Sequence, residues 1–342
     1  MILRSRRCGS RGYIVRRELF LEAVRRRKPT NVSVFGTATS IACQELMDRE
    51  NAHFPQAHLD AETMAKLAIS GHTVLGFDVV MPLFSVCHEA AAMGCDVNWG
   101  GVDAMPEAGK PIFRTVDDIR IPNDLLKRPA CAVPLEAIRL LKKRLGHDAA
   151  VCGKVFGGWT QAYHYFGVEN FLIGTIDDPA NTQRILDALV PVTIAFARAQ
   201  IDAGADCILL ADHATRDLCS PAAYEQFLAP MHAYLAEQIE APTLLHICGD
   251  TGDRIGAIAR TGVDCFHWDT KTGDPEKVRR LAGADLALMG GISNYTLLRG
   301  TPEQVAEASQ QANQASVDIV GPECAIPLQT PLDNLLAITS GG

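Results

Sequence analysis

The chain contains 342 residues, 47% of them hydrophobic, and its 32 basic and 40 acidic side chains leave a formal charge of -8 at pH 7. This length suits one large domain or two ordinary ones, and the negative charge argues against a general role in nucleic-acid binding. No apolar run is long enough to span a bilayer and no secretory signal is evident, so we expect the eleven cysteines to be mostly free thiols in a reducing cytoplasm.

The first 28 residues are strongly basic, with ten Arg and Lys residues against only Glu18 and Glu22. Such a segment can be an arm that docks an acidic partner, a targeting peptide, or a flexible lead followed by a solvated helix over Arg16–Arg27. Charge runs usually lie on solvated faces, which favours the last interpretation. We therefore expect residues 1–15 to form a flexible basic extension and residues 16–342 a single catalytic domain.

The first half of the chain predicts strands and helices in a less regular order, with a Pro- and Gly-rich stretch at residues 99–131 that is typical of an insertion over one end of a fold. The predicted strands are Val32–Phe35, Gly76–Val80 and Ala149–Val155, and the predicted helices are Ala38–Arg49, Asp60–Ser70, Phe84–Met93 and Pro134–Leu145.

The second half alternates helix and strand from about residue 180. One long helix begins with Pro179 and is followed by Gly204, as helices prefer, and another has Ser220 as its N-cap and Pro221 in its first turn. The predicted strands are Cys207–Ala211, Thr243–His246, Cys265–Trp268, Leu286–Met289 and Val317–Val320, and the predicted helices are Pro179–Ala203, Ser220–Glu240, Arg254–Arg260, Pro275–Leu281, Thr301–Ala315 and Pro331–Ile338.

These strands are continuous apolar runs rather than alternating ones, which indicates parallel strands covered on both faces. Eight such strands match the (β/α)8 TIM barrel of the α/β class. A doubly wound sheet is the alternative fold.

Candidate functional residues lie at the carboxyl ends of the later strands, where the active groups of a TIM barrel lie. In chain order they are Asp212 and His213, His246 and Cys248, Asp269, Gly290 and Gly291, and Cys324. Two thiols and one imidazole are ligands that zinc takes, and three protein ligands leave one position open, as in catalytic zinc sites. The sequence therefore predicts that His246, Cys248 and Cys324 bind Zn2+.

The other strand-end residues each have a functional and a plain interpretation. Asp212 and Asp269 are catalytic groups, or they are ordinary aspartates that cap a turn or end a strand. Gly290 and Gly291 allow a ligand to approach the rim closely, or they are plain turn glycines. The sequence prediction is the functional interpretation for all four residues.

At these residues the chain resembles the uroporphyrinogen decarboxylase superfamily, and within it the methylcobamide:coenzyme M methyltransferases. The resemblance covers nearly the whole chain after about residue 16. Its strongest motifs are Leu245-His-Ile-Cys-Gly249, Gly321-Pro-Glu-Cys-Ala-Ile-Pro-Leu-Gln-Thr-Pro331, and Gln44-Glu-Leu-Met-Asp48 with Met64-Ala-Lys-Leu-Ala68.

The resemblance implies a zinc methyltransferase in which His246, Cys248 and Cys324 bind the metal. Asp269 stands where the family has an acidic residue, with Glu expected, and it would be a displaceable fourth ligand. The chain shows no corrinoid domain, so a methylated corrinoid would arrive on a partner protein. The substrate thiol would lose its proton to Asp269 or Asp212 and attack the methyl group in line, leaving Co(I).

Four functions stay open at this point. The acceptor is a small thiol such as coenzyme M, or it is tetrahydrofolate. A decarboxylase is disfavoured, because the porphyrinogen decarboxylases carry an R-Q-A-G-R motif and Thr37-Ala-Thr-Ser40 contains no arginine. A barrel with a structural metal is the non-enzyme alternative, although a structural zinc normally closes with a fourth Cys or His.

Overall fold

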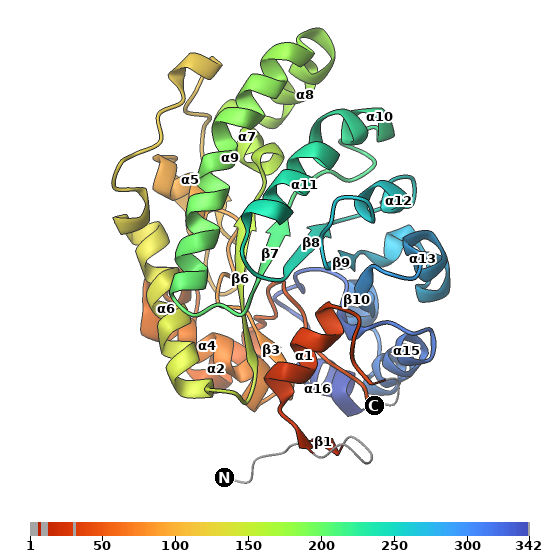
Figure 1. Ribbon diagram of the computed structural model, residues 1–342. Helices are drawn as coiled ribbons and strands as arrows, with labels where there is room; N and C mark the ends of the chain where they lie inside the picture. The colour runs from red at the N-terminus through yellow and green to blue at the C-terminus, as the bar shows by residue number, and fades with distance from the viewer. Residues whose placement is uncertain (1–5, 8–12, 30–31, 341–342) are drawn as a thin grey trace.

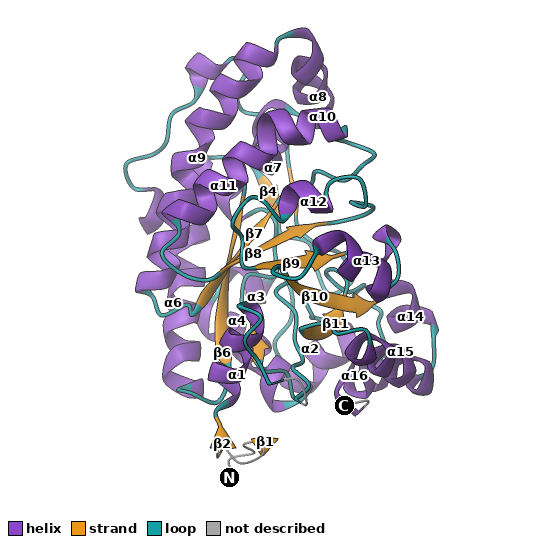
Figure 2. Ribbon diagram, turned by 45° about the vertical axis from the view of Figure 1, so that its right-hand side comes forward, coloured by secondary structure: helices purple, strands orange, loops and turns teal. Residues whose placement is uncertain are grey.

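The computed structural model describes residues 6–7, 13–29 and 32–340. Its centre is a parallel sheet of seven strands in the order β11-β10-β9-β8-β7-β6-β3 (Figures 1 and 2). The strands are β3 (Val79–Val80), β6 (Ala150–Phe156), β7 (Cys207–Ala211), β8 (Thr243–Ile247), β9 (Cys265–Trp268), β10 (Ala287–Ile292) and β11 (Ile319–Pro322).

The segment over residues 34–36 takes the eighth position and closes the barrel. On one side the Gly36 amide donates to the Val320 carbonyl at 3.0 Å, and the Val320 amide donates to the Val34 carbonyl at 2.8 Å. On the other side the Asp78 amide donates to the Phe35 carbonyl at 2.8 Å. The predicted (β/α)8 barrel is confirmed, although its first strand is reduced to an isolated bridge between Phe35 and Val320.

Helices surround the sheet on its outer face (Figure 2), and none of those in the described part of the chain is long and apolar enough to cross a membrane. They are α1 (Arg16–Val24), α2 (Gln44–Glu50), α3 (Gln56–Leu59), α4 (Ala61–Thr73), α5 (His88–Met93), α6 (Pro129–Leu145), α7 (Gly158–Phe166), α8 (Val168–Asp177), α9 (Pro179–Asp202), α10 (Pro221–Ala223), α11 (Ala229–Gln238), α12 (Ile255–Ile258), α13 (Pro275–Ala282), α14 (Asn294–Arg299), α15 (Pro302–Gln314) and α16 (Leu332–Ser340).

Two predicted helices differ from the observed ones for local reasons. The helix expected from Ala38 begins only at Gln44, because the Thr37 hydroxyl accepts from the Thr39 amide and offers the backbone an alternative to the first helical turn. The helix expected to run to Glu240 is interrupted by a π-helical turn at Tyr224–Leu228. Pro230 follows this turn and has no N–H to continue the ladder of hydrogen bonds.

The insertion at residues 99–131 is mostly irregular, as expected. It contains part of a short antiparallel ladder, β4 (Val97–Asn98) with β5 (Glu107–Ala108), and its last residues, from Pro129, already belong to α6. The backbone amides of Ile112 and Phe113 both donate to the carbonyl of Tyr165 in α7. The insertion therefore packs on the helix that follows β6.

The N-terminal helix α1 lies across the end of the barrel at which the strands begin (Figure 1). Leu19 and Phe20 are buried in a core that extends to Ile338. Two arginines of α1 and one that follows the helix form ion pairs with aspartates that precede strands, namely Arg16 with Asp78 at 3.5 Å, Arg17 with Asp206 at 2.7 Å and, beyond the helix, Arg26 with Asp318 at 3.8 Å.

The prediction of a helix in this segment is therefore confirmed, and the prediction that it is a solvated one is wrong. Arg16, Arg17 and Arg26 face the ends of strands, where each guanidinium lies beside a buried aspartate. This direction could not be read from a charge run. Of the expected flexible extension, residues 6–7 and 13–14 pair as the antiparallel strands β1 and β2, and residues 1–5 and 8–12 lie outside the described part of the chain.

Candidate metal centre

Three ligand atoms converge at the carboxyl end of the barrel. His246 lies in β8, Cys248 directly follows that strand, and Cys324 follows β11. His246 Nε2 lies 3.0 Å from Cys248 Sγ and 3.4 Å from Cys324 Sγ, and the two sulfur atoms are 3.2 Å apart. Within the described residues, this is the one group of three or more potential metal ligands whose atoms all lie within 4.8 Å of one another.

Barrel closure and a glycine turn bring these side chains together. β9 and β10 separate β8 from β11 in the sheet, so Cys324 reaches Cys248 only because the strands curve around the barrel mouth. The chain leaves β8 through Gly249 at a φ of 78°, and a Cβ there would lie 2.3 Å from Thr215 Oγ1. Glycine alone fits this turn.

The backbone fixes the orientation of His246. Its Nδ1 lies 3.0 Å from the carbonyl oxygen of His267, which can only accept, so Nδ1 carries the proton and Nε2 presents its lone pair to the thiols. His267 Nε2 in turn donates to the Pro322 carbonyl at 2.8 Å. Burial holds the pKa of His267 well below its ordinary value, so this linking histidine stays neutral.

The two thiols have opposite proton affinities. The hydrogen bond from Cys248 holds the pKa of Cys324 well below its ordinary value. The same contact, together with burial, holds the pKa of Cys248 well above its ordinary value, because two thiolates at 3.2 Å repel each other. The direction of these shifts favours the thiolate form of Cys324, the form that binds metals.

This donor set fits zinc. A tetrahedral zinc with bonds of about 2.3 Å to sulfur and about 2.0 Å to nitrogen separates its ligand atoms by roughly 3.4–3.8 Å. The 3.4 Å separation nearly fits, and the separations of 3.0 and 3.2 Å need to widen by about half an ångström. His246, Cys248 and Cys324 would hold the metal.

Asp269 lies close to this centre and supports its loops. One carboxylate oxygen accepts from the Gly249 amide at 2.8 Å, and the other accepts from the Lys271 amide at 2.9 Å. Asp269 is also the N-cap of the 3-10 turn Thr270–Thr272. Its carboxylate thus holds the turn after Cys248, and its predicted role as a displaceable fourth ligand stays a prediction.

Asp212 is buried beneath the rim. One oxygen accepts from the amide and hydroxyl of Thr160 at 2.8 and 2.9 Å, and the other lies 3.0 Å from His232 Nε2. A Cβ on Gly157 would lie 1.9 Å from this carboxylate, so α7 begins against it. The carboxylate joins α7, β7 and α11, and its predicted role as a proton acceptor stays a prediction.

Gly290 and Gly291 lie within β10 at φ angles of 128° and 101°. A Cβ on Gly290 would lie 2.9 Å from the Trp268 carbonyl oxygen, and one on Gly291 would lie 2.9 Å from the Ala312 Cβ. Close packing against β9 and α15 is therefore sufficient reason for both glycines. Their predicted contact with a cofactor stays a prediction.

Glu323 was missed by the sequence analysis although it precedes Cys324. Its carboxylate accepts from the Thr270 amide at 2.9 Å, from the Thr270 hydroxyl, and from the Asn294 amide at 2.7 Å. Glu323 thereby ties the β11 loop to the loops after β9 and β10, and it fixes Cys324 at the rim. The sequence feature that could have identified Glu323 is its position directly before the predicted ligand Cys324.

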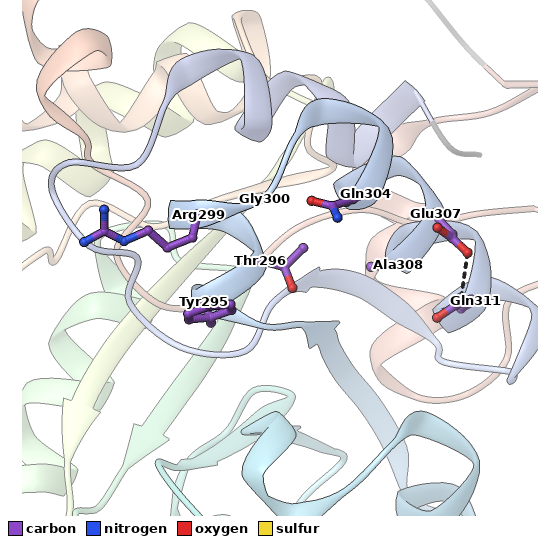
Figure 3. A pocket seen from close by; sticks show the side chains of 8 residues that line it. All are labelled: Tyr295, Thr296, Arg299, Gly300, Gln304, Glu307, Ala308 and Gln311. Carbon is purple, nitrogen blue, oxygen red and sulfur yellow. Dashed lines mark hydrogen bonds between the residues drawn. The ribbon is translucent and has the colours of Figure 1, made fainter.

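A surface hollow of about 400 Å³ lies elsewhere, between α14 and α15 (Figure 3). Its lining is polar and open, with Tyr295 at 78% exposure, and Glu307 on its wall accepts from Gln311. None of the three predicted metal ligands lines it. The hollow is therefore separate from the candidate metal centre.

Comparison with known proteins agrees with the fold. The profile of the uroporphyrinogen decarboxylase (URO-D) family matches residues 16–340. The chain is 34% identical over 295 residues to a methylated-thiol–coenzyme M methyltransferase of Methanosarcina mazei, covering 86% of this chain and 80% of the relative. It is 31% identical over 316 residues to the methylcobamide:CoM methyltransferase MtaA of Methanosarcina barkeri, covering 92% and 93%.

A solved structure described as a methyltransferase from Methanosarcina mazei superposes with a TM-score of 0.92 at 30% identity, covering 96% of this chain and 98% of that one. The chain therefore belongs to the uroporphyrinogen decarboxylase family. Within that family its similarity to the methylcobamide:CoM methyltransferases, which the motifs predicted, is confirmed.

Proposed function

We propose that this protein is a zinc-dependent methyltransferase that moves a methyl group from a methylated corrinoid protein to a small thiol such as coenzyme M. The observation that carries the proposal is the convergence of His246, Cys248 and Cys324 at the barrel mouth within 3.4 Å of one another. The names of the two relatives support the same chemistry, since one is a methylated-thiol–coenzyme M methyltransferase and the other a methylcobamide:CoM methyltransferase.

The reaction needs a thiolate, because a free thiol has a pKa near ~8.5 and is a poor nucleophile at neutral pH. Zinc, when bound, would supply the positive charge that makes the incoming thiol lose its proton. His246, Cys248 and Cys324 would hold that charge at the mouth, with Asp269 fixing the turn that carries Cys248.

The transfer itself balances without a redox partner. A carbon–sulfur bond forms as the cobalt–carbon bond breaks, the electron pair of that bond stays on the corrinoid as Co(I), and the thiol proton passes to a base or to water. Asp269 and Asp212 remain the carboxylates that we propose for this proton.

A folate acceptor and a decarboxylase are weaker proposals. The two relatives described above are named for coenzyme M, and a thiol acceptor makes direct use of the zinc ligands. Uroporphyrinogen decarboxylases belong to the same family, but residues 37–40 contain none of the arginines that their motif places there.

Metal analysis together with a methyl-transfer assay tests the proposed function. We expect about one zinc per chain in the purified protein, and strong loss of zinc in Cys248→Ala and Cys324→Ser. Cys131→Ala, which changes a buried cysteine of α6, is the matched control and should keep its zinc. Methylcob(III)alamin mixed with 2-mercaptoethanesulfonate should give the Co(I) spectrum with the wild type and the control alone.

Well under one zinc per chain, with full methyl transfer by Cys324→Ser, would overturn the proposal. Zinc that is retained but inaccessible to added thiols would favour the structural-metal alternative. Transfer to tetrahydrofolate without transfer to any thiol would replace the acceptor while leaving the metal centre in place.

A further inference from the structure

Lys154 is a buried cation on the inner face of the barrel. It lies in β6 with 5% of its surface exposed, whereas lysines are almost never buried without a partner. A Cβ on the neighbouring Gly153 would lie 2.6 Å from Gln200 of α9, so residue 153 faces the helices. Because alternate residues of a strand point to opposite faces, Lys154 faces the barrel interior.

The ammonium lies near the level of the candidate metal centre. Lys154 Nζ is 5.5 Å from the ring centroid of Phe156. Phe156 pairs in register with Ala211, and Ala211 pairs with His246. The Phe156 ring is 5.9 Å from that of His213, at the end of β7. Lys154 therefore lies one inward-facing row below the row that holds His246.

This ammonium has no ionic partner in the described part of the chain. In that part of the chain the hydrogen bonds found for Lys154 are those of its backbone with Gln200, and no ion pair of Nζ with a carboxylate within 4.0 Å is found. Burial lowers the pKa of Lys154 to about 8, against the raising effects of Glu89 and Cys324, so the side chain is mostly charged at pH 7.

Glu89 is only a partial counter-charge. Burial raises the pKa of its carboxyl to about 7, and one oxygen is already occupied by the Phe156 amide at 2.9 Å. A buried charge without a full partner is unfavourable for folding. An anionic ligand that binds beside the metal centre would neutralise this buried ammonium.

We propose that Lys154 binds the anionic end of the acceptor, so that the substrate is a short thiol with a sulfonate or carboxylate a few bonds from its sulfur. This inference rests on the proposed function, because it places the sulfur at His246, Cys248 and Cys324. It adds a specificity-determining residue: the cation below the metal centre selects charged thiols over neutral ones of the same length.

Calorimetric titration of the zinc-loaded protein tests this inference with three probes. They are 2-mercaptoethanesulfonate, the neutral 2-mercaptoethanol, and ethanesulfonate, which lacks the thiol. We expect Lys154→Met to raise the Kd of 2-mercaptoethanesulfonate by about 10- to 100-fold, the range for a hydrogen bond to a charged group. The Kd of 2-mercaptoethanol should change by less than about 2-fold. Lys66→Met, on the exposed face of α4, is the control and should change neither.

If Lys154→Met weakened the binding of both thiols equally, or changed the binding of neither, the inference would be overturned. The wild type alone gives a second readout if Lys154→Met fails to fold: similar Kd values for the charged and neutral thiols would also overturn it. Ethanesulfonate binding needs no sulfur site, so Lys154-dependent binding of this probe would support the anion site even in a protein that held no zinc or transferred no methyl group.

Discussion

Polar side chains inside this barrel are held by particular backbone groups, and the residues around the metal centre show how. His246 is oriented by a carbonyl of β9, Cys324 is positioned through Glu323, and the turn after Cys248 is fixed by Asp269. Each ligand is therefore positioned through a contact to β9 or to the loops after β9 and β10. Such outer partners of metal ligands commonly change metal affinity by about 10- to 100-fold when they are lost.

Glu89 gives a prediction about pH at the residue scale. Its side chain is buried and its pKa is raised from 4.5 to about 7 by desolvation. A carboxyl whose pKa is raised by folding does not lower the free energy of unfolding below about pH 4.5. It lowers that free energy increasingly as the pH rises to about 7, and the loss is constant above that pH. Glu89→Gln keeps an oxygen for the Phe156 amide and removes the charge.

We therefore expect Glu89→Gln to match the wild type near pH 4.5 and to be more stable near pH 8, by on the order of 1–3 kcal/mol at about 1.36 kcal/mol per pKa unit. Urea denaturation at the two pH values measures the difference. Glu237→Gln on α11, an exposed position, should show no such trend. An advantage that shrinks as the pH rises would contradict the burial argument.

At the scale of elements, the loops after β6 and β7 are locked together by one buried network. The hydroxyl of Tyr224, in the π-helical turn, lies 3.1 Å from His232 Nδ1, and His232 Nε2 lies 3.0 Å from Asp212 Oδ2. Asp212 accepts from Thr160 at the start of α7. Because every member is buried, loss of the central acceptor leaves donors without partners.

Asp212→Ala should therefore lower the free energy of unfolding by about 2–4 kcal/mol, whereas Asp212→Asn should lower it by about 1 kcal/mol, since the amide oxygen still accepts from Thr160. Thermal and urea unfolding measure both. Asp217→Asn, exposed in the same loop, is the control. Equal losses in the two Asp212 variants would show that the network contributes little.

The sequence predicted most of the strands because parallel strands buried on both faces are continuous apolar runs. It failed where tertiary contacts decide the backbone. Helices α7 and α8 are short and separated by Gly167 at a φ of 84°, and they were not recognised. The first strand needed β11 and the segment before β3 to define it, so residues 34–36 form only a bridge.

The three metal ligands were predicted because their residue types stand at strand ends, where the chemistry of a barrel collects. The role of Lys154 was not predicted, because this residue lies inside the apolar run of β6. Only the orientation of its side chain, into the barrel, indicates a function. That direction follows from Gly153 packing on Gln200, a contact between segments that are far apart in the sequence.

On the scale of the whole molecule, one end of the barrel carries the candidate metal centre and the other end carries contacts that stabilise the fold. The candidate metal centre lies at the carboxyl ends of the strands, and α1 covers the amino ends, at the bottom of the barrel in Figure 1. There Asp206 accepts from Arg17 at 2.7 and 2.9 Å, from Lys142 at 2.5 Å, and from the Val151 amide at 2.9 Å. This carboxylate joins α1, α6 and β6 at a single point.

Asp206 should accordingly contribute acid-sensitive stability without affecting methyl transfer. Burial raises the pKa of its carboxyl, but the bonds from Arg17, Lys142 and Val151 outweigh burial, so the folded-state pKa lies below the ordinary value of 3.8. A carboxyl with a lowered pKa stabilises the fold above about pH 4, and that contribution is lost as the pH falls through the folded-state pKa.

We therefore expect Asp206→Asn to lower the free energy of unfolding by about 2–3 kcal/mol at pH 7, and we expect this difference from the wild type to shrink as the pH falls below about 4. Denaturant titrations from pH 7 to pH 3 measure it. Asp117→Asn removes an exposed pair with Arg184 and should have no measurable effect, since exposed ion pairs contribute little. A deficit in Asp206→Asn that stayed constant down to pH 3 would show that α1 is held by its apolar face, through Leu19 and Phe20, rather than by its arginines.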